Sequence, residues 1–203
     1  MEQQEVAKML QRMNAIVNAG LIYGHDSFDQ ARYHEFKQLL AELLVEQSGL
    51  SLGEVDNFLR PTAWYPTPLI DVRAVVVREN RILLVQSAID GKWSLPGGYA
   101  EVGTSPKENV LKELKEESGL EGEVLRLLAI FDSNSHQLQG QQYYKMFFAC
   151  AAKGGQFTLN AETVAAQYFP INNLPDLSLV RNTAWQIERC HQVWLSAGEA
   201  IID

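Results

Sequence analysis

One segment, residues 97–120, restricts the fold more than any other part of the chain. A turn containing two glycines is followed by Ser105, which suits the N-cap of a helix, and by Glu108, which can complete a capping box. Gly119 is the residue type that most often ends a helix in the left-handed conformation. The segment therefore predicts a glycine turn that leads into a helix of about three turns over residues 106–118.

The predicted helix carries glutamates on one face. Glu113, Glu116 and Glu117 stand at i, i+3 and i+4, so a single turn of helix stacks them. Taken alone, such a cluster is more often a solvated acidic face. With the glycine turn in front of it, we interpret the cluster as a cation site. Oxygen ligands of this kind suit Mg²⁺, with Mn²⁺ as the alternative.

This spacing resembles the Nudix box. Two positions depart from the family pattern, because Thr104 stands where an acid is usual and Lys112 stands where an arginine is usual. Thr104 cannot act as a carboxylate ligand, and Lys112 keeps its charge but loses the bidentate fork. The positions that match are Gly98, Glu113, Leu114, Glu116, Glu117, Gly119 and Leu120.

The chain also resembles a bacterial Nudix group with a helical N-terminal extension, which includes CDP-choline and ADP-ribose pyrophosphatases. The matching pieces surround Asp71, Tyr99, Tyr144 and Glu162. The resemblance implies an α/β fold, the Nudix α/β/α sandwich with a mixed sheet, preceded by a small helical unit. It also implies metal-dependent hydrolysis of the pyrophosphate bond in a small nucleotide substrate, with CDP-choline or ADP-ribose as leading candidates.

The resemblance assigns roles to individual residues. Glu113, Glu116 and Glu117 would bind the metal, with the Gly97 carbonyl as a further ligand. Glu162 is our first choice for the general base, and Glu101, on the loop before the helix, is the reserve. We expect the substrate to be bound by Arg73, His136, Lys145 and Tyr144.

Hydrophobic periodicity and turn residues outline the rest of the chain. We expect a helical domain over residues 1–60, a proline-punctuated linker over 61–69 and a Nudix domain over 70–203. The helices expected outside the glutamate helix cover residues 3–18, 28–47, 52–59 and 179–196. The expected strands cover residues 72–77, 82–86, 93–95, 123–132, 143–152 and 166–169.

Composition excludes some classes of function. The net charge of −8 comes without a basic stripe, so we expect no duplex nucleic acid as a partner. No apolar run approaches the length of a membrane span, and the N-terminal residues do not resemble a secretory signal. Cys150 and Cys190 lack metal-type spacing, and we expect both to stay reduced in a cytoplasmic protein.

Two other functions remain open from the sequence. One is a catalytically silent Nudix module that senses a ligand, although such a module has no need for mutually repelling acids. The other is an RNA-processing Nudix enzyme, which the missing basic surface disfavours. The apolar stripes of the N-terminal helices exceed what a small unit can bury alone, so we expect them either to cover the cleft or to pair two subunits, and a homodimer is the expected assembly.

Overall fold

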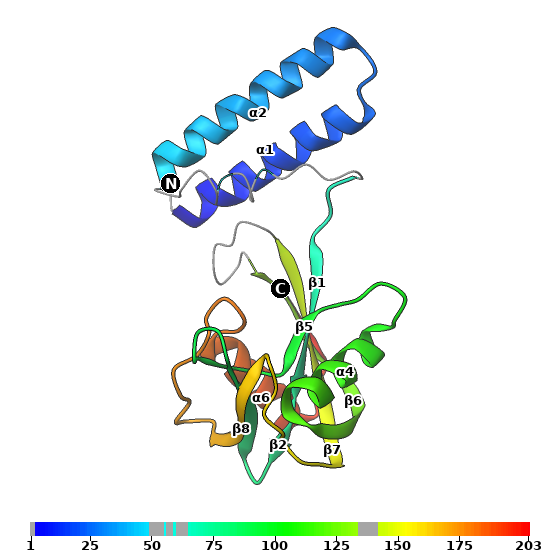
Figure 1. The fold of residues 1–203 in the computed structure, drawn as a ribbon, viewed down its shortest axis with the longest axis vertical. Coiled ribbons are helices and arrows are strands. Elements are labelled where there is room, and N and C mark those ends of the chain that lie inside the picture. The colour runs from blue at the N-terminus through cyan, green and yellow to red at the C-terminus, as the bar shows by residue number, and fades with distance from the viewer. Residues whose placement is uncertain (1–2, 49–54, 56–58, 60–64, 134–141) are drawn as a thin grey trace. The chain divides into compact units, whose positions relative to one another are not determined.

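The computed structural model describes residues 3–48, 55, 59, 65–133 and 142–203. The chain divides into two compact units, of which the first extends to Leu69 and the second begins at Ile70 (Figure 1). No helix in the described part of the chain combines the length and the apolar character that crossing a membrane requires.

The first unit contains the helices α1 (Gln3–Tyr23) and α2 (Ser27–Ser48) within its described residues. Asp26 caps α2, because its Oδ1 accepts the backbone N–H groups of Phe28 at 2.9 Å and Asp29 at 3.1 Å. The α1 helix continues beyond its predicted end at residue 18. The predicted helix over 52–59 lies outside the described residues except for two positions. The buried core of the unit consists of Leu10, Leu40, Leu44, Val55 and Leu59.

In the described residues, the second unit holds two sheets and the helices α4 (Pro106–Ser118) and α6 (Ala184–Ser196). One sheet has the strand order β5-β1-β7-β6-β9, and the other has the order β2-β3-β4 with β8 also paired to β3. The strands are β1 (Leu69–Val75), β2 (Val77–Arg78), β3 (Arg81–Ser87), β4 (Trp93–Ser94), β5 (Gly97–Tyr99), β6 (Leu120–Asp132), β7 (Tyr143–Gly155), β8 (Thr163–Pro170) and β9 (Ile201–Ile202).

Side chains of β7 alternate between the two faces of the sheet, and each face packs against a different helix. Phe147 packs in a cluster with Ile187 of α6, whereas the next residue, Phe148, packs in a second cluster with Val110 and Leu114 of α4. Because successive side chains of a strand point to opposite faces, α4 and α6 cover opposite sides of this sheet. The predicted α/β/α sandwich with a mixed sheet is therefore confirmed, since β6 pairs antiparallel with β7 and parallel with β9.

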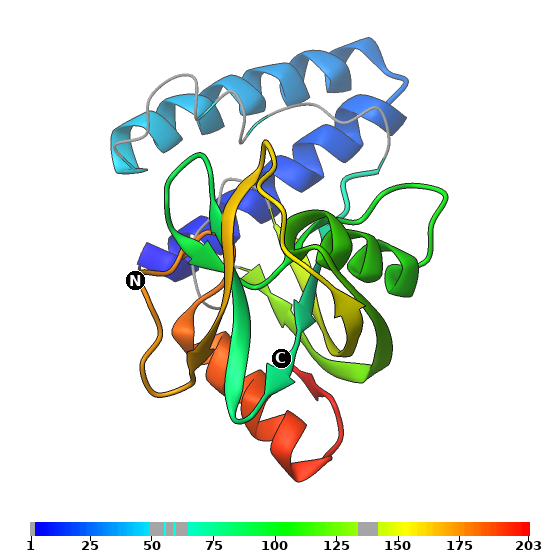
Figure 2. The same ribbon diagram turned by 60° about the horizontal axis from the view of Figure 1, so that its bottom comes forward.

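Local turn chemistry explains the connection between β2 and β3. The β2–β3 hairpin turns at Glu79 and Asn80, whose φ angles are 52° and 57°. Both angles are positive, as a two-residue hairpin of type I′ requires. The β3 strand also pairs antiparallel with β8 over its whole length, and Figure 2 shows these two strands side by side.

The prediction for the last helix was wrong at its start. The α6 helix begins at Ala184 rather than at residue 179, because Thr183 and Gln186 form a capping box there. The preceding residues form a turn instead, in which the Arg181 N–H donates to the Ser178 carbonyl at 2.9 Å. This turn carries side chains into the site described next.

Candidate active site

The glycine turn lies against the acidic face of α4. Gly97, in β5, donates its N–H to Oε2 of Glu117 at 2.8 Å. A Cβ at Gly97 would lie 2.0 Å from the Val72 carbonyl, and one at Gly98 would lie 3.0 Å from Oε1 of Glu113. The Gly97 position therefore needs glycine, whereas a side chain at Gly98 would push the Glu113 carboxylate aside by a few tenths of an ångström.

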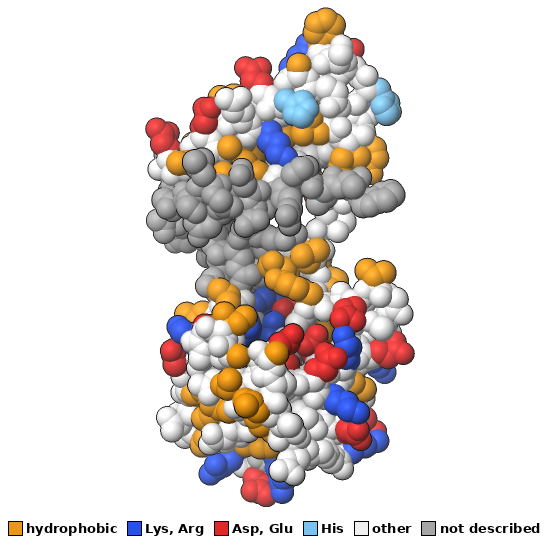
Figure 3. Space-filling view, viewed as in Figure 1, with side chains coloured by type: hydrophobic (Ala, Val, Ile, Leu, Met, Phe, Trp, Pro, Cys, Tyr) orange, Lys and Arg blue, Asp and Glu red, His pale blue; other side chains and the backbone are white. Residues whose placement is uncertain are grey.

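The α4 helix, which presents these carboxylates, begins and ends at the residues that its sequence predicts. Ser105 and Glu108 form the capping box, and Gly119 adopts φ 71° at the C-cap. Figure 3 shows acidic side chains gathered on one face of the second unit, with Lys and Arg side chains among them.

Crowding perturbs the carboxylates. Burial raises the pKa of Glu113 to about 7, and the neighbouring charges of Glu117 and Glu116 add to this effect. Burial also raises the pKa of Glu117, although the Gly97 N–H and the charge of Arg73 oppose the increase. Such a cluster favours a proton or a cation over mutual repulsion.

Glu116 lies near a lysine as well as near Glu113, whose pKa its charge raises. Its Oε2 lies 3.7 Å from Nζ of Lys112, which makes a closer ion pair, 2.6 Å, with Oε1 of Glu101. Thr104 donates its hydroxyl to the Glu101 carbonyl at 3.0 Å. Within the described residues, no three His, Cys, Asp or Glu side chains converge closely enough to hold a metal. Glu116 would have to turn away from Lys112 to join Glu113 and Glu117.

The loop before β8 is fixed to the last turn of α4. Asn160 donates its side-chain amide to the Glu116 carbonyl at 3.0 Å, and the Thr163 hydroxyl donates to the Glu117 carbonyl at 2.9 Å. These contacts satisfy carbonyls that have no partner within the helix. They also bring Glu162 to the wall of a cavity of about 140 Å³ that Glu117 lines as well.

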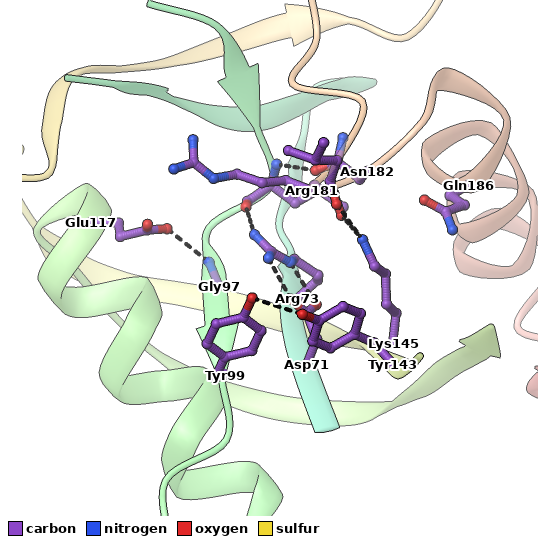
Figure 4. A network of polar contacts seen from close by, with 12 residues as sticks. Asp71, Arg73, Gly97, Tyr99, Glu117, Tyr143, Lys145, Arg181, Asn182 and Gln186 are labelled. Atoms are coloured by element: carbon purple, nitrogen blue, oxygen red, sulfur yellow. Dashed lines mark hydrogen bonds and ion pairs between the residues drawn. The ribbon is translucent and has the colours of Figure 1, made fainter. Parts of the chain in front are cut away.

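The basic residues expected to bind substrate are both buried, and Figure 4 shows their contacts. Arg73 donates through Nε to Oδ1 of Asp71 at 2.8 Å and through Nη1 to the Leu95 carbonyl at 3.3 Å. Lys145 donates to the carbonyls of Val180 and Arg181 at 2.8 and 2.6 Å. Burial lowers the pKa of Lys145 to about 8. Both cations thus fix neighbouring structure, and the charge of Arg73 also acts on Glu113 and Glu117.

Aromatic residues lie on one side of this network. Tyr143 and Tyr99 stack with ring centroids 5.4 Å apart, and their hydroxyl oxygens lie 3.2 Å from one another. Tyr144, which we expected to bind substrate, follows Tyr143 in β7 and is 42% exposed. His136, also expected at the site, lies outside the described residues.

Sequence reasoning missed several residues of the site. The pairing of Asp71 with Arg73 could have been found, since residues two apart in a strand share a face. Asn160 and Thr163 stand beside Glu162 in the sequence, but nothing in the sequence places them on α4. Arg181 lines the cavity together with Glu117 and Glu162, and no local pattern marks it.

Comparison with known proteins places the two units in known families. The family described as "NUDIX domain" matches residues 67–189, and the family described as "UDP-X-like, N-terminal oligomerisation domain" matches residues 4–59. The chain is 46% identical to "Putative ADP-ribose pyrophosphatase YjhB" of Bacillus subtilis (strain 168), over 87% of this chain and 86% of that protein.

Solved structures give a similar result. A crystal structure of a UDP-X diphosphatase is 45% identical, with a TM-score of 0.67 and coverage of 100% of both chains. A crystal structure of an ADP-ribose pyrophosphatase from Streptococcus suis 89-1591 is 43% identical, with a TM-score of 0.63, and covers 68% of this chain and 100% of its own.

Proposed function

The chain belongs to the Nudix hydrolase family, and on that premise we propose that it hydrolyses the pyrophosphate bond of a nucleoside diphosphate linked to a second moiety. One observation carries the proposal. Glu117 accepts a hydrogen bond from the glycine turn and lines the same cavity as Glu162 and Arg181. An acid that can hold a cation, an acid that can act as a general base and a basic group that can bind phosphate therefore line one small cavity.

We propose Mg²⁺, with Mn²⁺ as the alternative, as the cofactor held by Glu113, Glu116 and Glu117. The donor set fits a hard cation, because it offers carboxylate oxygens, and burial together with the neighbouring charges raises the pKa of Glu113. The Gly97 carbonyl remains a further proposed ligand. When bound, such an ion neutralises a diphosphate and lowers the pKa of a coordinated water.

We assign Glu162 as the general base. The Glu162 N–H donates to Oδ1 of Asn160 at 2.9 Å, and its carbonyl accepts from the Ala88 N–H at 2.8 Å. Main-chain contacts on both sides thus hold the carboxylate at the cavity wall, where it can take a proton from water. The water oxygen then bonds to one phosphorus while the bond to the bridging oxygen breaks, which gives two phosphate-terminated products. Glu101 is less suited, because Lys112 pairs with it.

The proposal also concerns the identity of the substrate, that is, the nucleoside and the group linked to its diphosphate. The names of the relatives point to ADP-ribose and to UDP-linked compounds, and CDP-choline remains a candidate from the sequence. Purified protein should be assayed with ADP-ribose, a UDP-sugar, CDP-choline and a capped RNA, each with Mg²⁺, with Mn²⁺ and with EDTA. Cation-dependent release of a nucleoside monophosphate supports the proposal. Binding without turnover of any of them favours the silent module, and selective turnover of the RNA favours the RNA-processing enzyme.

A Glu162→Gln variant tests the base. We expect kcat to fall roughly 100-fold or more, in the range typical of general-base catalysis, with little change in KM. Glu101→Gln is the matched comparison and should keep most of the activity. The opposite ranking would transfer the assignment to Glu101.

We also propose that the chain forms a homodimer through α2. Phe36, Leu39 and Leu43 follow helical spacing and are 40%, 54% and 41% exposed, and the family matched over residues 4–59 is described as an oligomerisation domain. Leu39→Glu should shift sedimentation toward the monomer, whereas His34→Glu, with the same change of charge at an exposed position of α2, should not. A monomeric wild-type protein would refute this proposal.

A further inference from the structure

Arg181 occupies a position that its neighbours in the sequence do not explain. It lies in the turn before α6, and Figure 4 shows its side chain extending toward the side of the site where Glu117 lies. Arg181 lines the cavity of about 140 Å³ with Glu117 and Glu162. At about 30 Å³ per water molecule, the cavity has room for several waters or for a phosphate group.

The other basic side chains near the site are committed to protein partners. Arg73 is bound to Asp71, Lys145 to main-chain carbonyls, and Lys112 to Glu101. The contact of Arg181 with an acid is longer, 3.9 Å between Nη1 and Oδ1 of Asp90, which is too long for a hydrogen bond. Among the described residues that line the cavity, Arg181 is the cationic one. Its guanidinium is therefore the cationic donor that an anion would meet there.

The turn that carries Arg181 is held from two sides. Lys145, on β7, donates its ammonium to the carbonyls of Val180 and Arg181. Asn182 accepts the Leu95 N–H at 2.8 Å, which connects the turn to the segment entering the glycine turn. Burying an ammonium is costly, and here it serves to fix a short irregular segment rather than a helix or strand. Such an arrangement is expected where the position of one side chain matters.

We propose that Arg181 binds a phosphate oxygen of the diphosphate in this cavity, and that Lys145 is a positioning residue that acts through Arg181. The proposal rests on the proposed function and refines it. A guanidinium can hold two phosphate oxygens in a planar fork, which an ammonium cannot. Facing Glu117 and Glu162, it also offsets the repulsion between these acids and the anionic substrate.

Imidodiphosphate, which resists hydrolysis of its P–N–P bridge, is the probe for binding. Calorimetry with Mg²⁺ should show that Arg181→Gln weakens its affinity roughly 10- to 100-fold, as expected for lost hydrogen bonds to a charged group. Arg181→Lys should recover part of the affinity, because the charge remains and the fork does not. Arg78→Gln is the matched control, since it removes the same charge from an arginine that also lies 3.9 Å from an acid, Glu79. It should bind as the wild type does.

Lys145 is tested with a double-mutant cycle. If Lys145 acts through Arg181, Lys145→Gln combined with Arg181→Gln should lose no more affinity than Arg181→Gln alone. Additive losses would overturn the positioning role. Should the buried Lys145 variant fail to fold, which thermal unfolding would reveal, comparison of KM and kcat between Arg181→Lys and Arg181→Gln decides the role of Arg181. A contact to phosphate predicts partial rescue in the lysine variant, and equal values in the two variants would contradict it.

The outcomes separate this proposal from the function on which it rests. Wild-type affinity for imidodiphosphate in Arg181→Gln would overturn the role of Arg181 while hydrolysis by the wild type upheld the function. If binding depends on Arg181 but the wild-type protein hydrolyses no nucleotide, the role of Arg181 in binding stands and the proposed function is refuted. A wild-type protein that neither binds the probe nor hydrolyses a nucleotide would refute both.

Discussion

Replacing Glu117 by glutamine tests whether the acidic face of α4 carries the chemistry. The amide has nearly the shape of the carboxylate, and its oxygen can still accept the Gly97 N–H that Oε2 accepts at 2.8 Å. The substitution therefore removes a charge from the cavity that Glu117 shares with Glu162 without removing the contact between α4 and the glycine turn.

The cost in stability should be small. A hydrogen bond to a charged acceptor contributes about 1 kcal/mol more than a neutral one, so the exchange loses roughly that amount. Burial raises the pKa of Glu117, which means that folding disfavours its charged form, and glutamine relieves this cost. The two effects oppose one another, and we expect a change within about 1 kcal/mol, or roughly 2–4 °C in Tm for a chain of this size.

The cost in turnover should be large. A group that holds the cation is expected to stabilise the transition state by several kcal/mol, and about 3–5 kcal/mol corresponds to a fall in kcat of roughly 10²- to 10⁴-fold. Steady-state kinetics at saturating Mg²⁺, alongside thermal unfolding, measure both quantities. Glu123→Gln, which removes an exposed carboxylate paired with Lys153, is the control and should retain activity. Full activity of Glu117→Gln in a folded protein would refute the assignment.

Two further predictions concern the glycine turn and pH. Gly98→Ala should lower kcat about tenfold or more with little change in Tm, because the new Cβ would lie 3.0 Å from a carboxylate oxygen of Glu113 and would push it aside. Gly97→Ala should instead destabilise the fold by about 3 kcal/mol or more, because its Cβ would lie 2.0 Å from a backbone carbonyl. Without added metal, folding stability should fall as pH rises from 4.5 to about 7, because folded Glu113 retains a proton that the unfolded chain loses in this range. Thermal unfolding of Glu113→Gln should lack this component, and an unchanged pH profile would contradict it.

Local chemistry made much of the fold predictable. The α4 helix begins and ends where Ser105, Glu108 and Gly119 place it, because caps act through backbone groups within a few residues. The β2–β3 hairpin follows from Glu79 and Asn80 for the same reason. Strand β5 was not predicted, because two of its residues are glycines and carry no hydrophobic pattern.

Contacts between distant segments were not predictable. Apolar residues before α6 suggested an earlier start of the helix, but Lys145 binds the carbonyls of Val180 and Arg181 from another strand. The glutamates were found from their spacing, yet the ion pairs of Lys112 with Glu101 and Glu116 come from the fold and not from that spacing. The cavity itself depends on where Arg181 and Glu162 meet Glu117, which only the folded sheet determines.

The way Asn160 and Thr163 hold α4 has a consequence for how this scaffold can change. Both side chains bind main-chain carbonyls, those of Glu116 and Glu117, so neither contact depends on which side chain stands at these two positions. Acids can therefore be exchanged for other groups, in nature or by design, while the loop and the helix stay in register. The same backbone framework can thus pass from one reaction to another, or to binding without reaction, through a few substitutions.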